Sequence, residues 1–523
     1  MTRLRTAVAT ATYRRLVPLL LLAAFAAQAA FSALTASHTF DEKTHRAYGS
    51  QVLFAHSFER TVHRFNTTSP VMALSALPVL LQGRMGVSRS QREQLTDARL
   101  PTILLGVLLG WLVFSWTRAI WGFAAGALAL GFYAFCPNVL AHSSLVTTDV
   151  VTTLAVFAAM YALWRFWSLP TWPRAVVTGL VWGLALVTKV SSVFLLPISL
   201  LAVGVARIDA DAPEAPSGLR SRAAWVKVLV AAGIAAVVLN SCYLWQGSFA
   251  PLTGYQAVSA RFRRLVDMPV LSRLPVPLPR GFVEGLDWAS NDLARSRWAY
   301  CLGRYSRRGF PHYYVVAMAT KATLGLLAAI LLAAAVGRPR ALTRRHWPFL
   351  LVPVLFYFTY FSLFFTFQIG IRHLLLIFPF LFVMVGRLAN RSPAIARVSW
   401  LLLVLHAGSS LRMSPHYIAY FNEAANPMHG WRYLADSNLD WGQDRASVAA
   451  YVRDSKVPMA VNPPGPTAGR SIVAGNALAG LTPGAHARYA WLRDCFEPVG
   501  TVGYSYFVYD VSPQRLGQCA SAR

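Results

Sequence analysis

The stretch that decides the fold joins residues 16–36, LVPLLLLAAFAAQAAFSALTA, to residues 41–49, DEKTHRAYG. The first part is predominantly apolar and long enough to cross a membrane, so the second part should begin on the far side. If the second part is helical, Asp41 and His45 share one face, whereas Glu42 points about 100° away from Asp41. Charged carboxylates are energetically unfavourable inside lipid, so their presence at its edge suggests a functional role. On these residues alone, the stretch is equally a solvated loop or a functional site.

The composition indicates a membrane protein with many spans. Hydrophobic residues make up 55% of the 523 residues, charged residues only 13%, and the mean hydropathy is +0.44. Soluble domains contain about 25% charged residues. The net charge of +28 comes mainly from arginines scattered between apolar runs. Because they form no compact basic domain, we exclude nucleic acid as a partner and expect anionic lipid head groups or a lipid-linked phosphate.

The apolar runs predict about eleven spans, and therefore a mainly α, polytopic bundle of membrane helices. The basic N-terminal run resembles a signal peptide in outline, but the many later spans favour a retained anchor helix. The expected spans lie near residues 16–36, 100–117, 121–136, 147–167, 175–189, 191–206, 225–246, 313–336, 348–366, 373–389 and 398–411.

The arginines in the short loops predict the orientation. They favour a cytoplasmic N-terminus, and an odd number of spans then places the end of the chain outside. We therefore expect a transmembrane domain over residues 1–411, with long outer loops at about 37–99 and 247–312. Residues 412–523 should form a soluble extracytoplasmic domain, and the protein should lie in the plasma (inner) membrane.

The tail, residues 412–523, is polar and predicts a small α/β domain. Its segment 436–444, DSNLDWGQD, has the spacing of a calcium loop, but Trp441 replaces the required glycine and Ser447 the required glutamate. An EF-hand is therefore excluded, and an Asx-turn that caps a helix over about 444–454 is favoured. Residues 501–511 predict a strand. Cys495 and Cys519 share the tail and could pair in an oxidising compartment.

The outer face collects several charged residues at separate membrane-edge segments. Asp149 begins one span, Lys189 ends another, Lys321 falls about two turns inside a third, and Arg372-His373 precedes a fourth. Taken singly, Lys189 is a snorkelling lysine, Lys321 needs a partner, and Arg372 is equally an interface anchor or a phosphate ligand. Together with Asp41, they suit a reaction in which cations hold a lipid-borne phosphate and a carboxylate serves as base.

Several segments carry a resemblance to a known family. They are Asp41-Glu42, Thr147-Thr148-Asp149, residues 183–189, residues 303–309 with Lys321, Arg372-His373 with Pro379, residues 416–423 and residues 436–444. With these segments the chain resembles the integral-membrane glycosyltransferases of the C-type fold. It looks most like the bacterial, lipid-carrier-dependent branch related to protein O-mannosyltransferases and the lipid A aminoarabinose transferase. The resemblance covers most of the chain.

The resemblance implies a polyprenyl-phosphate-sugar donor and an inverting displacement at the anomeric carbon. A carboxylate of the first outer loop is then the general base, with Asp41 the first choice and Glu42 the second. Arg372, Lys321 and Lys189 are implied as ligands of the donor phosphate. His45, Asp149 and His373 would help to shape the pocket. His373 stands where an aromatic residue is common in the family, and residues 310–314, FPHYY, depart from the usual aromatic cluster.

Other functions remain open at this point. A secondary transporter or lipid flippase is one alternative, although the chain has no internal repeat and its ionisable residues gather at one edge. A non-catalytic membrane scaffold is another. No cofactor is implied with certainty, but the outer carboxylates could hold a divalent cation. The acceptor could be a protein, a lipid or a glycan.

Overall fold

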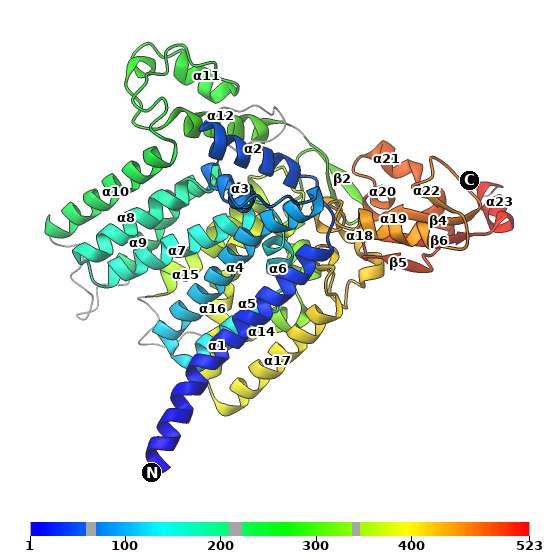
Figure 1. Ribbon diagram of the computed structural model, residues 1–523, viewed down its shortest axis with the longest axis horizontal. Coiled ribbons are helices and arrows are strands. Elements are labelled where there is room, and N and C mark those ends of the chain that lie inside the picture. The colour runs from blue at the N-terminus through cyan, green and yellow to red at the C-terminus, as the bar shows by residue number, and fades with distance from the viewer. Residues whose placement is uncertain (1, 59–68, 209–221, 296, 337–345, 522–523) are drawn as a thin grey trace.

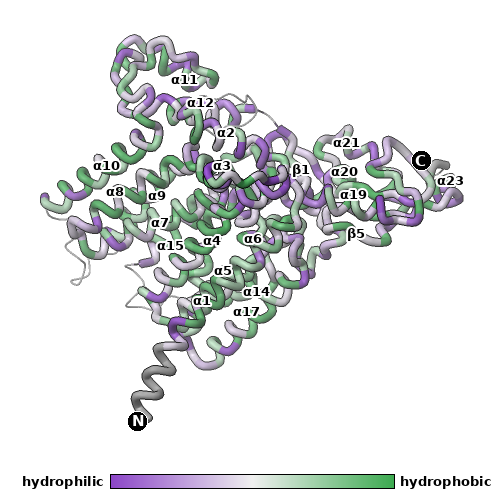
Figure 2. The backbone as a smooth tube through the Cα atoms, viewed as in Figure 1, coloured by the Kyte–Doolittle hydropathy of each residue, from purple (hydrophilic) through white to green (hydrophobic). Residues whose placement is uncertain are grey.

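The computed structural model describes residues 2–58, 69–208, 222–295, 297–336 and 346–521 (Figure 1). Helices dominate, and the two sheets are small. Figure 2 shows hydrophobic residues along much of the central bundle, which includes α1, α4, α5, α14 and α17. The mainly α, polytopic architecture expected from the sequence is confirmed.

Eleven apolar helical segments of the described residues overlap the eleven expected spans. Seven of them are long and apolar enough to cross a membrane. They are Thr12–Thr35 of α1 (Thr2–Thr35), α4 (Gln91–Trp121), α7 (Asp149–Ser168), Val190–Arg207 of η2 (Val190–Phe194) and α9 (Leu195–Ile208), α10 (Arg222–Cys242), Ile371–Asn390 of η5 (Ile371–Ile377), α16 (Phe378–Gly386) and η6 (Arg387–Asn390), and α17 (Pro393–Arg412).

The other four apolar segments depart from straight, full-length spans. Two are bent pairs that pass the same test together: α5 (Phe123–Ala134) with α6 (Pro137–Ser143), bent by 63°, and α13 (Tyr313–Lys321) with α14 (Leu324–Ala335), bent by 115°. Two are shorter apolar helices, α8 (Trp172–Leu186) and α15 (Trp347–Leu363). The protein is therefore a multi-pass membrane protein.

The break between α13 and α14 is stabilised by two asparagines. The side-chain amide of Asn422 donates to the carbonyls of Ala319, at 2.6 Å, and Ala322, at 2.8 Å. The side-chain amide of Asn138 donates to the carbonyl of Lys321 at 2.7 Å. Carbonyls freed at a helix break within a membrane protein need such partners, because lipid offers none. Asn422 thereby ties the start of the tail to the bundle.

Both long loops that we expected on the outer face contain helices. The first holds α2 (Glu42–Ala55), η1 (Pro70–Ala76) and α3 (Leu77–Arg84), and the second holds α11 (Ala260–Val266), η4 (Leu271–Arg273), α12 (Arg280–Ala294) and the hairpin β1 (Ala299–Cys301) and β2 (Arg304–Ser306). The span α4 begins earlier than the apolar run predicts, because Ser90 and Glu93 form a capping box at its N-terminus.

The tail contains a four-stranded sheet in the order β3–β4–β6–β5. Strands β3 (Met459–Val461) and β4 (Gly469–Ala474) are parallel, whereas β4–β6 and β5–β6 are antiparallel. The helices of the tail are η7 (Tyr417–Ala419), η8 (Pro427–His429), α18 (Gly430–Tyr433), η9 (Asp436–Asn438), α19 (Arg445–Arg453), α20 (Gly475–Ala479), α21 (Pro483–Arg488), α22 (Ala490–Cys495) and α23 (Pro513–Ser521).

Two expectations for the tail need correction. The strand predicted over residues 501–511 is a hairpin of β5 (Gly500–Val502) and β6 (Tyr506–Val511). Gly503 and Tyr504 both have positive φ values, of 65° and 58°, and turn the chain between the strands. The expected Asx-turn is present, since the carboxylate of Asp440 accepts from the N–H of Gly442 at 2.9 Å. It does not cap α19, whose N-cap residue Asp444 makes no side-chain capping bond.

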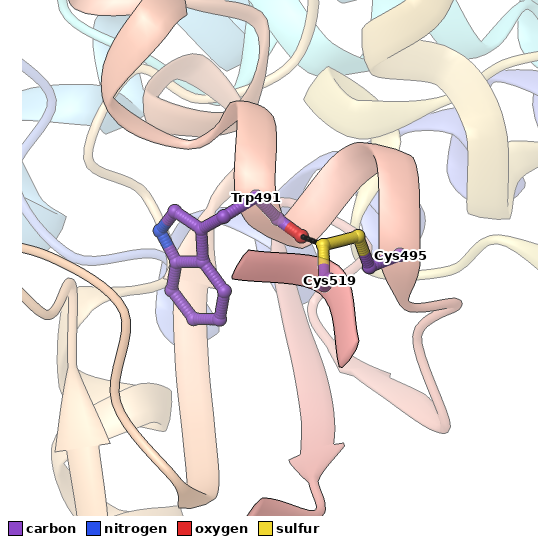
Figure 3. The surroundings of a disulfide bond; sticks show 3 residues. All are labelled: Trp491, Cys495 and Cys519. Carbon is purple, nitrogen blue, oxygen red and sulfur yellow. Dashed lines mark hydrogen bonds between the residues drawn. A yellow bond between two sulfur atoms is a disulfide. The ribbon is translucent and has the colours of Figure 1, made fainter. Parts of the chain in front are cut away.

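Cys495 and Cys519 form a disulfide bond that joins α22 to α23 (Figure 3). Their Cα atoms lie 6.2 Å apart, and the carbonyl of Trp491 lies 3.8 Å from the sulfur of Cys519. The pairing considered from the sequence is therefore present. It fixes the last helix of the tail against the helix before the β5–β6 hairpin.

Candidate active site

A cavity of about 820 Å³ opens where α2, α7, η5 and the tail meet. Six residues singled out in the sequence line it: Asp41, His45, Asp149, Lys189, Arg372 and His373. They come from four separate segments of the membrane domain. The structure thus brings together most of the predicted site, and it places Glu42 and Lys321 elsewhere.

Asp41 and Arg372 form an ion pair in this cavity. Nη1 of Arg372 donates to Oδ2 of Asp41 at 2.9 Å, and the side chains are only 12% and 10% exposed. Asp41 is the N-cap residue of α2, but its carboxylate caps no backbone N–H of that helix. The guanidinium carbon of Arg372 lies 4.4 Å from the ring centre of Trp441, which comes from the tail. Arg372 therefore joins the segment that contains Asp41 to the tail.

A second acid and a second cation extend this pair. Nζ of Lys189 donates to Oδ1 of Asp149 at 2.9 Å, and Nη1 of Arg372 lies 3.8 Å from Oδ2 of Asp149. Asp149 is the first residue of α7, where the helix dipole favours a negative charge. Two polar atoms of the network, Oδ2 of Asp149 and Nε of Arg372, have no hydrogen-bond partner among the residues that the structure describes. The network therefore keeps hydrogen-bonding capacity for a ligand.

His45 lines the cavity beside Asp41, whereas His373 lines it among aromatic side chains. His45 follows Asp41 by one helical turn in α2, and its Nδ1 has no hydrogen-bond partner in the described part of the chain. Burial lowers its pKa and outweighs the opposing effect of Asp41 and Asp149, so its ring is neutral at neutral pH. His373 stacks 5.7 Å from Phe361, and its Nδ1 lies 3.0 Å from the hydroxyl of Tyr314. It belongs to an aromatic wall formed by Tyr360, Phe361, Phe365 and Phe367.

The structure corrects the expectation for Glu42. Its side chain is fully buried outside the cavity lining, and Arg99 donates to both carboxylate oxygens, at 2.8 and 2.7 Å. The N–H groups of Thr39 and Val146 also donate to it, each at 2.9 Å. Burial would raise the pKa of Glu42, but these donors and the charge of Arg99 hold it below its ordinary value. Glu42 is thus a structural anion with no oxygen left for a substrate.

Lys321 also has a different role from the one expected. Its ammonium group is buried, and it donates to the carbonyls of Ile418, at 2.8 Å, and Asn438, at 2.5 Å. It lies 4.5 Å from the ring centre of Phe421 and is absent from the cavity lining. As the last residue of α13, it places a positive charge at the negative end of the helix dipole. Lys321 therefore attaches the tail to the membrane helices and does not line the cavity.

The segment 436–442 of the tail forms one wall of the cavity, which the sequence did not reveal. Asp436, Asp440 and Trp441 line the cavity, while Asn438 holds the segment in place. The carbonyl oxygen of the Asn438 side chain accepts from the N–H of Ile371, next to Arg372, at 2.9 Å. Burial raises the pKa of Asp436 and that of Asp440 to about 6 each. The sequence showed the regular spacing of the aspartates in this segment, but it did not show that they lie close to Arg372.

The carboxylates do not fit a divalent cation. Among the residues that the structure describes, no group of three or more His, Cys, Asp or Glu side chains is placed to hold a metal ion. Asp41 and Asp149 are already paired with Arg372 and Lys189. The positive charges of Arg372 and Lys189 would repel a divalent metal ion bound at these carboxylates. The same positive groups suit a phosphate, and Asp41 beside them suits the acceptance of a proton.

A protein-family model matches part of the chain. Residues 90–241 match the family model described as dolichyl-phosphate-mannose-protein mannosyltransferase. The match confirms the resemblance to protein mannosyltransferases for this part of the chain. It includes α7 with Asp149 and the segment with Lys189, and it ends before η5 and the tail. A comparison with curated protein sequences gives no match.

Two kinds of solved structure are similar to this chain. One is the archaeal oligosaccharyltransferase AglB from Archaeoglobus fulgidus, in complex with an inhibitory peptide and a dolichol-phosphate: 14% identity, TM-score 0.44, 75% of this chain and 56% of that chain. The other is ArnT from Cupriavidus metallidurans bound to undecaprenyl phosphate: 13% identity, TM-score 0.33, 94% of this chain and 97% of that chain. The chain thus spans little more than half of AglB.

Proposed function

We propose that this protein transfers a sugar from a polyprenyl-phosphate-sugar to an acceptor hydroxyl at the outer face of the plasma membrane. The observation that carries the proposal is the ion pair of Arg372 and Asp41 inside a cavity of the membrane domain. The match of residues 90–241 to a mannosyltransferase family supports it. The undecaprenyl phosphate and dolichol-phosphate named for the similar structures are ligands of the same chemical class.

In the proposed reaction, Arg372 and Lys189 hold the donor phosphate. Arg372 and Lys189 both line the cavity, where a phosphate could reach their side chains. The acceptor oxygen then attacks the anomeric carbon, and the bond from that carbon to the phosphate oxygen breaks with its electron pair going to the phosphate. The cations stabilise the negative charge that develops there. The configuration at the anomeric carbon is inverted.

The proton of the acceptor hydroxyl passes to Asp41. Binding of phosphate to Arg372 competes with its bond to Asp41 and thereby frees Oδ2 of that carboxylate for the proton. Asp149 keeps Lys189 and Arg372 close together through its two oxygens. The neutral ring of His45 beside Asp41 leaves the carboxylate as the charged group that faces the acceptor.

The outward orientation rests on the arginine-rich inner loops, and the extracytoplasmic position of residues 412–523 follows from it. We further propose that these residues are a domain of the enzyme that completes the site, since Asp436, Asp440 and Trp441 line the cavity. The acceptor is a protein, a lipid or a glycan.

The test is sugar transfer by purified protein in lipid nanodiscs with synthetic polyprenyl-phosphate-sugars of several hexoses and pentoses. Transfer from one of them to an added acceptor, or to water in its absence, supports the proposal. Movement of the intact donor across proteoliposome membranes with no product would favour a flippase instead. The control Asp454→Asn alters an exposed carboxylate at the end of α19 and should leave transfer unchanged.

A further inference from the structure

Residues 244–274, between the span α10 and the helix α12, form a segment with an unusual surface. Eight of its large apolar side chains are exposed: Leu244, Trp245, Phe249, Leu265, Met268, Val270, Leu271 and Leu274. Val270 is 73% exposed and Phe249 56%. None of these residues belongs to a candidate membrane span of the described chain. A concentration of exposed apolar side chains outside the spans marks a surface that contacts a partner.

The segment is ordered, so this exposure is built into the fold. The N–H of Phe249 donates to the carbonyl of Val276 at 2.7 Å, and the N–H of Thr253 donates to the carbonyl of Ser272 at 3.0 Å. The two halves of the segment are thereby joined across its base. Hydrogen bonds between distant parts of a loop hold its side chains in fixed directions.

Asp287 of α12 attaches the segment to the rest of the protein. Its buried carboxylate accepts from the N–H groups of Val258, at 2.7 Å, and Ser259, at 2.8 Å. It also accepts from the hydroxyl of Tyr255 at 3.0 Å. A carboxylate with three such donors is a strong local anchor. The segment therefore has a fixed position relative to α12.

The turn that leaves α10 directs two large apolar residues outward. Leu244 and Trp245 have φ values of 53° and 57°, in the left-handed region that bulky side chains disfavour. Their N–H groups bond to the carbonyls of Ser241 and Asn240, which fixes this conformation. Both side chains are exposed directly after the last residue of a candidate span, Cys242. In this position an exposed tryptophan is typical of the interface between membrane and water.

The charge of the segment is strongly positive. Arg261, Arg263, Arg264 and Arg273 are its basic residues, and Asp267 is its only acidic one, so its net charge is 4 − 1 = +3. Arginines beside apolar residues at a membrane edge attract anionic head groups. Figure 1 shows α11 projecting beyond α12 on the side of the molecule that carries α10. Figure 2 shows hydrophobic and hydrophilic residues interspersed along it.

We propose that residues 244–274 lie in the outer surface of the lipid bilayer, with their apolar side chains among the lipids and their arginines at anionic head groups. Three observations favour lipid over a protein partner: the segment continues from a span, it is basic, and its aromatic residues follow the end of that span. The surface is also linked to the cavity. Arg261 of α11 and Phe282, Leu286 and Leu293 of α12 line the cavity, so an anchored segment would hold the cavity mouth at the membrane surface.

The test places a fluorescent label at the most exposed residue of the segment. Val270→Cys is labelled with an environment-sensitive dye in a Cys242→Ser background, and the protein is reconstituted in vesicles that contain brominated lipids. We expect blue-shifted emission that the bromine atoms quench. The matched control is Val499→Cys in the tail, which is 61% exposed, and its label should emit as in water without quenching.

Other outcomes would overturn the proposal. If the label at residue 270 emits as in water, the segment faces solvent. If its emission is blue-shifted but not quenched, a protein surface such as a second copy of the chain covers it. The double variant Arg263→Gln with Arg264→Gln should reduce quenching several-fold in anionic vesicles and leave it unchanged in zwitterionic ones. Equal quenching of this variant and its parent in both lipids would contradict the role of anionic head groups. None of these readouts depends on sugar transfer.

Discussion

Arg372 donates a hydrogen bond of 2.9 Å to Asp41 across 331 positions of the chain. The bond joins the segment that follows the first span to the start of the candidate span Ile371–Asn390. Trp441 of the tail packs against the same guanidinium. A cation and a potential base are thus adjacent in one cavity. Each side chain is the counter-charge of the other, and both are largely shielded from solvent.

Replacement of Arg372 by glutamine should remove the main positive charge at the proposed phosphate site. We expect kcat to fall by about 10²–10³-fold, as when a transition-state donor is removed elsewhere, and KM for the lipid donor to rise. Arg372→Lys should restore part of the activity because it keeps the charge but loses the planar fork. Steady-state kinetics with purified protein measures both effects. Arg397→Gln, in the exposed part of α17, is the control and should behave as the parent.

Glu42→Gln should destabilise the protein because it leaves the guanidinium of Arg99 buried without its counter-charge. The breaking of a buried pair in this way costs about 3–5 kcal/mol. Thermal unfolding in detergent measures the loss, and the double variant Glu42→Gln with Arg99→Met should recover part of it by removing the unpaired charge. If Glu42→Gln unfolds as the parent does and yet abolishes transfer, Glu42 is the base and the structural role assigned to it is wrong.

Lys321→Met should loosen the contact between the tail and the membrane helices. It removes the donors to the carbonyls of Ile418 and Asn438, so the wall formed by residues 436–442 loses support. We expect faster hydrogen exchange in this segment and a several-fold rise in KM with a smaller change in kcat. Lys227→Met is the matched control, since Lys227 also donates to a backbone carbonyl, that of Pro170. Equal exchange rates in the two variants would contradict the attachment role.

The stability of the folded protein should depend on pH through Asp436 and Asp440. Burial raises the pKa of each to about 6, whereas an aspartate in the unfolded chain titrates near 3.9. Between these values the folded state holds more protons, so the contribution of these groups to stability falls as the pH rises through this window. Asp436→Asn with Asp440→Asn should flatten the dependence of the unfolding temperature on pH between 5 and 7. Asp454→Asn should leave its slope unchanged.

Hydropathy predicted the membrane helices well, because each segment that crosses the bilayer must itself be apolar and long enough to span it. Even the bent pair α13–α14 appeared as one apolar run, since its break is satisfied by Asn138 and Asn422 from elsewhere in the chain. The hairpin in the tail was missed because its turn depends on the positive φ values of Gly503 and Tyr504 within a continuous β-favouring run. Local composition was therefore a good guide to element type and a poorer guide to breaks and turns.

Residues of the candidate site could be predicted only where a charged residue lay at a membrane edge with no partner nearby in the sequence. Asp41, Asp149, Lys189 and Arg372 were recognised as charges at membrane edges, and the structure brings them to one cavity. Glu42 carried the same signal, but its partner Arg99 lies 57 positions away and could not be inferred. A rotation of about 100° along one helix separates a cavity carboxylate from a structural one. The partners of Lys321 in the tail were hidden by the same limitation.

The rate of sugar transfer by Asp41→Asn tests the central claim most directly. The measurement is a single turnover with purified protein, a polyprenyl-phosphate-sugar and its acceptor, with binding of the free polyprenyl phosphate measured in parallel. If Asp41 is the base, the rate should fall by about 10²–10⁴-fold, while the lipid phosphate binds at least as well because Arg372 is no longer paired. Full activity of Asp41→Asn would contradict the account.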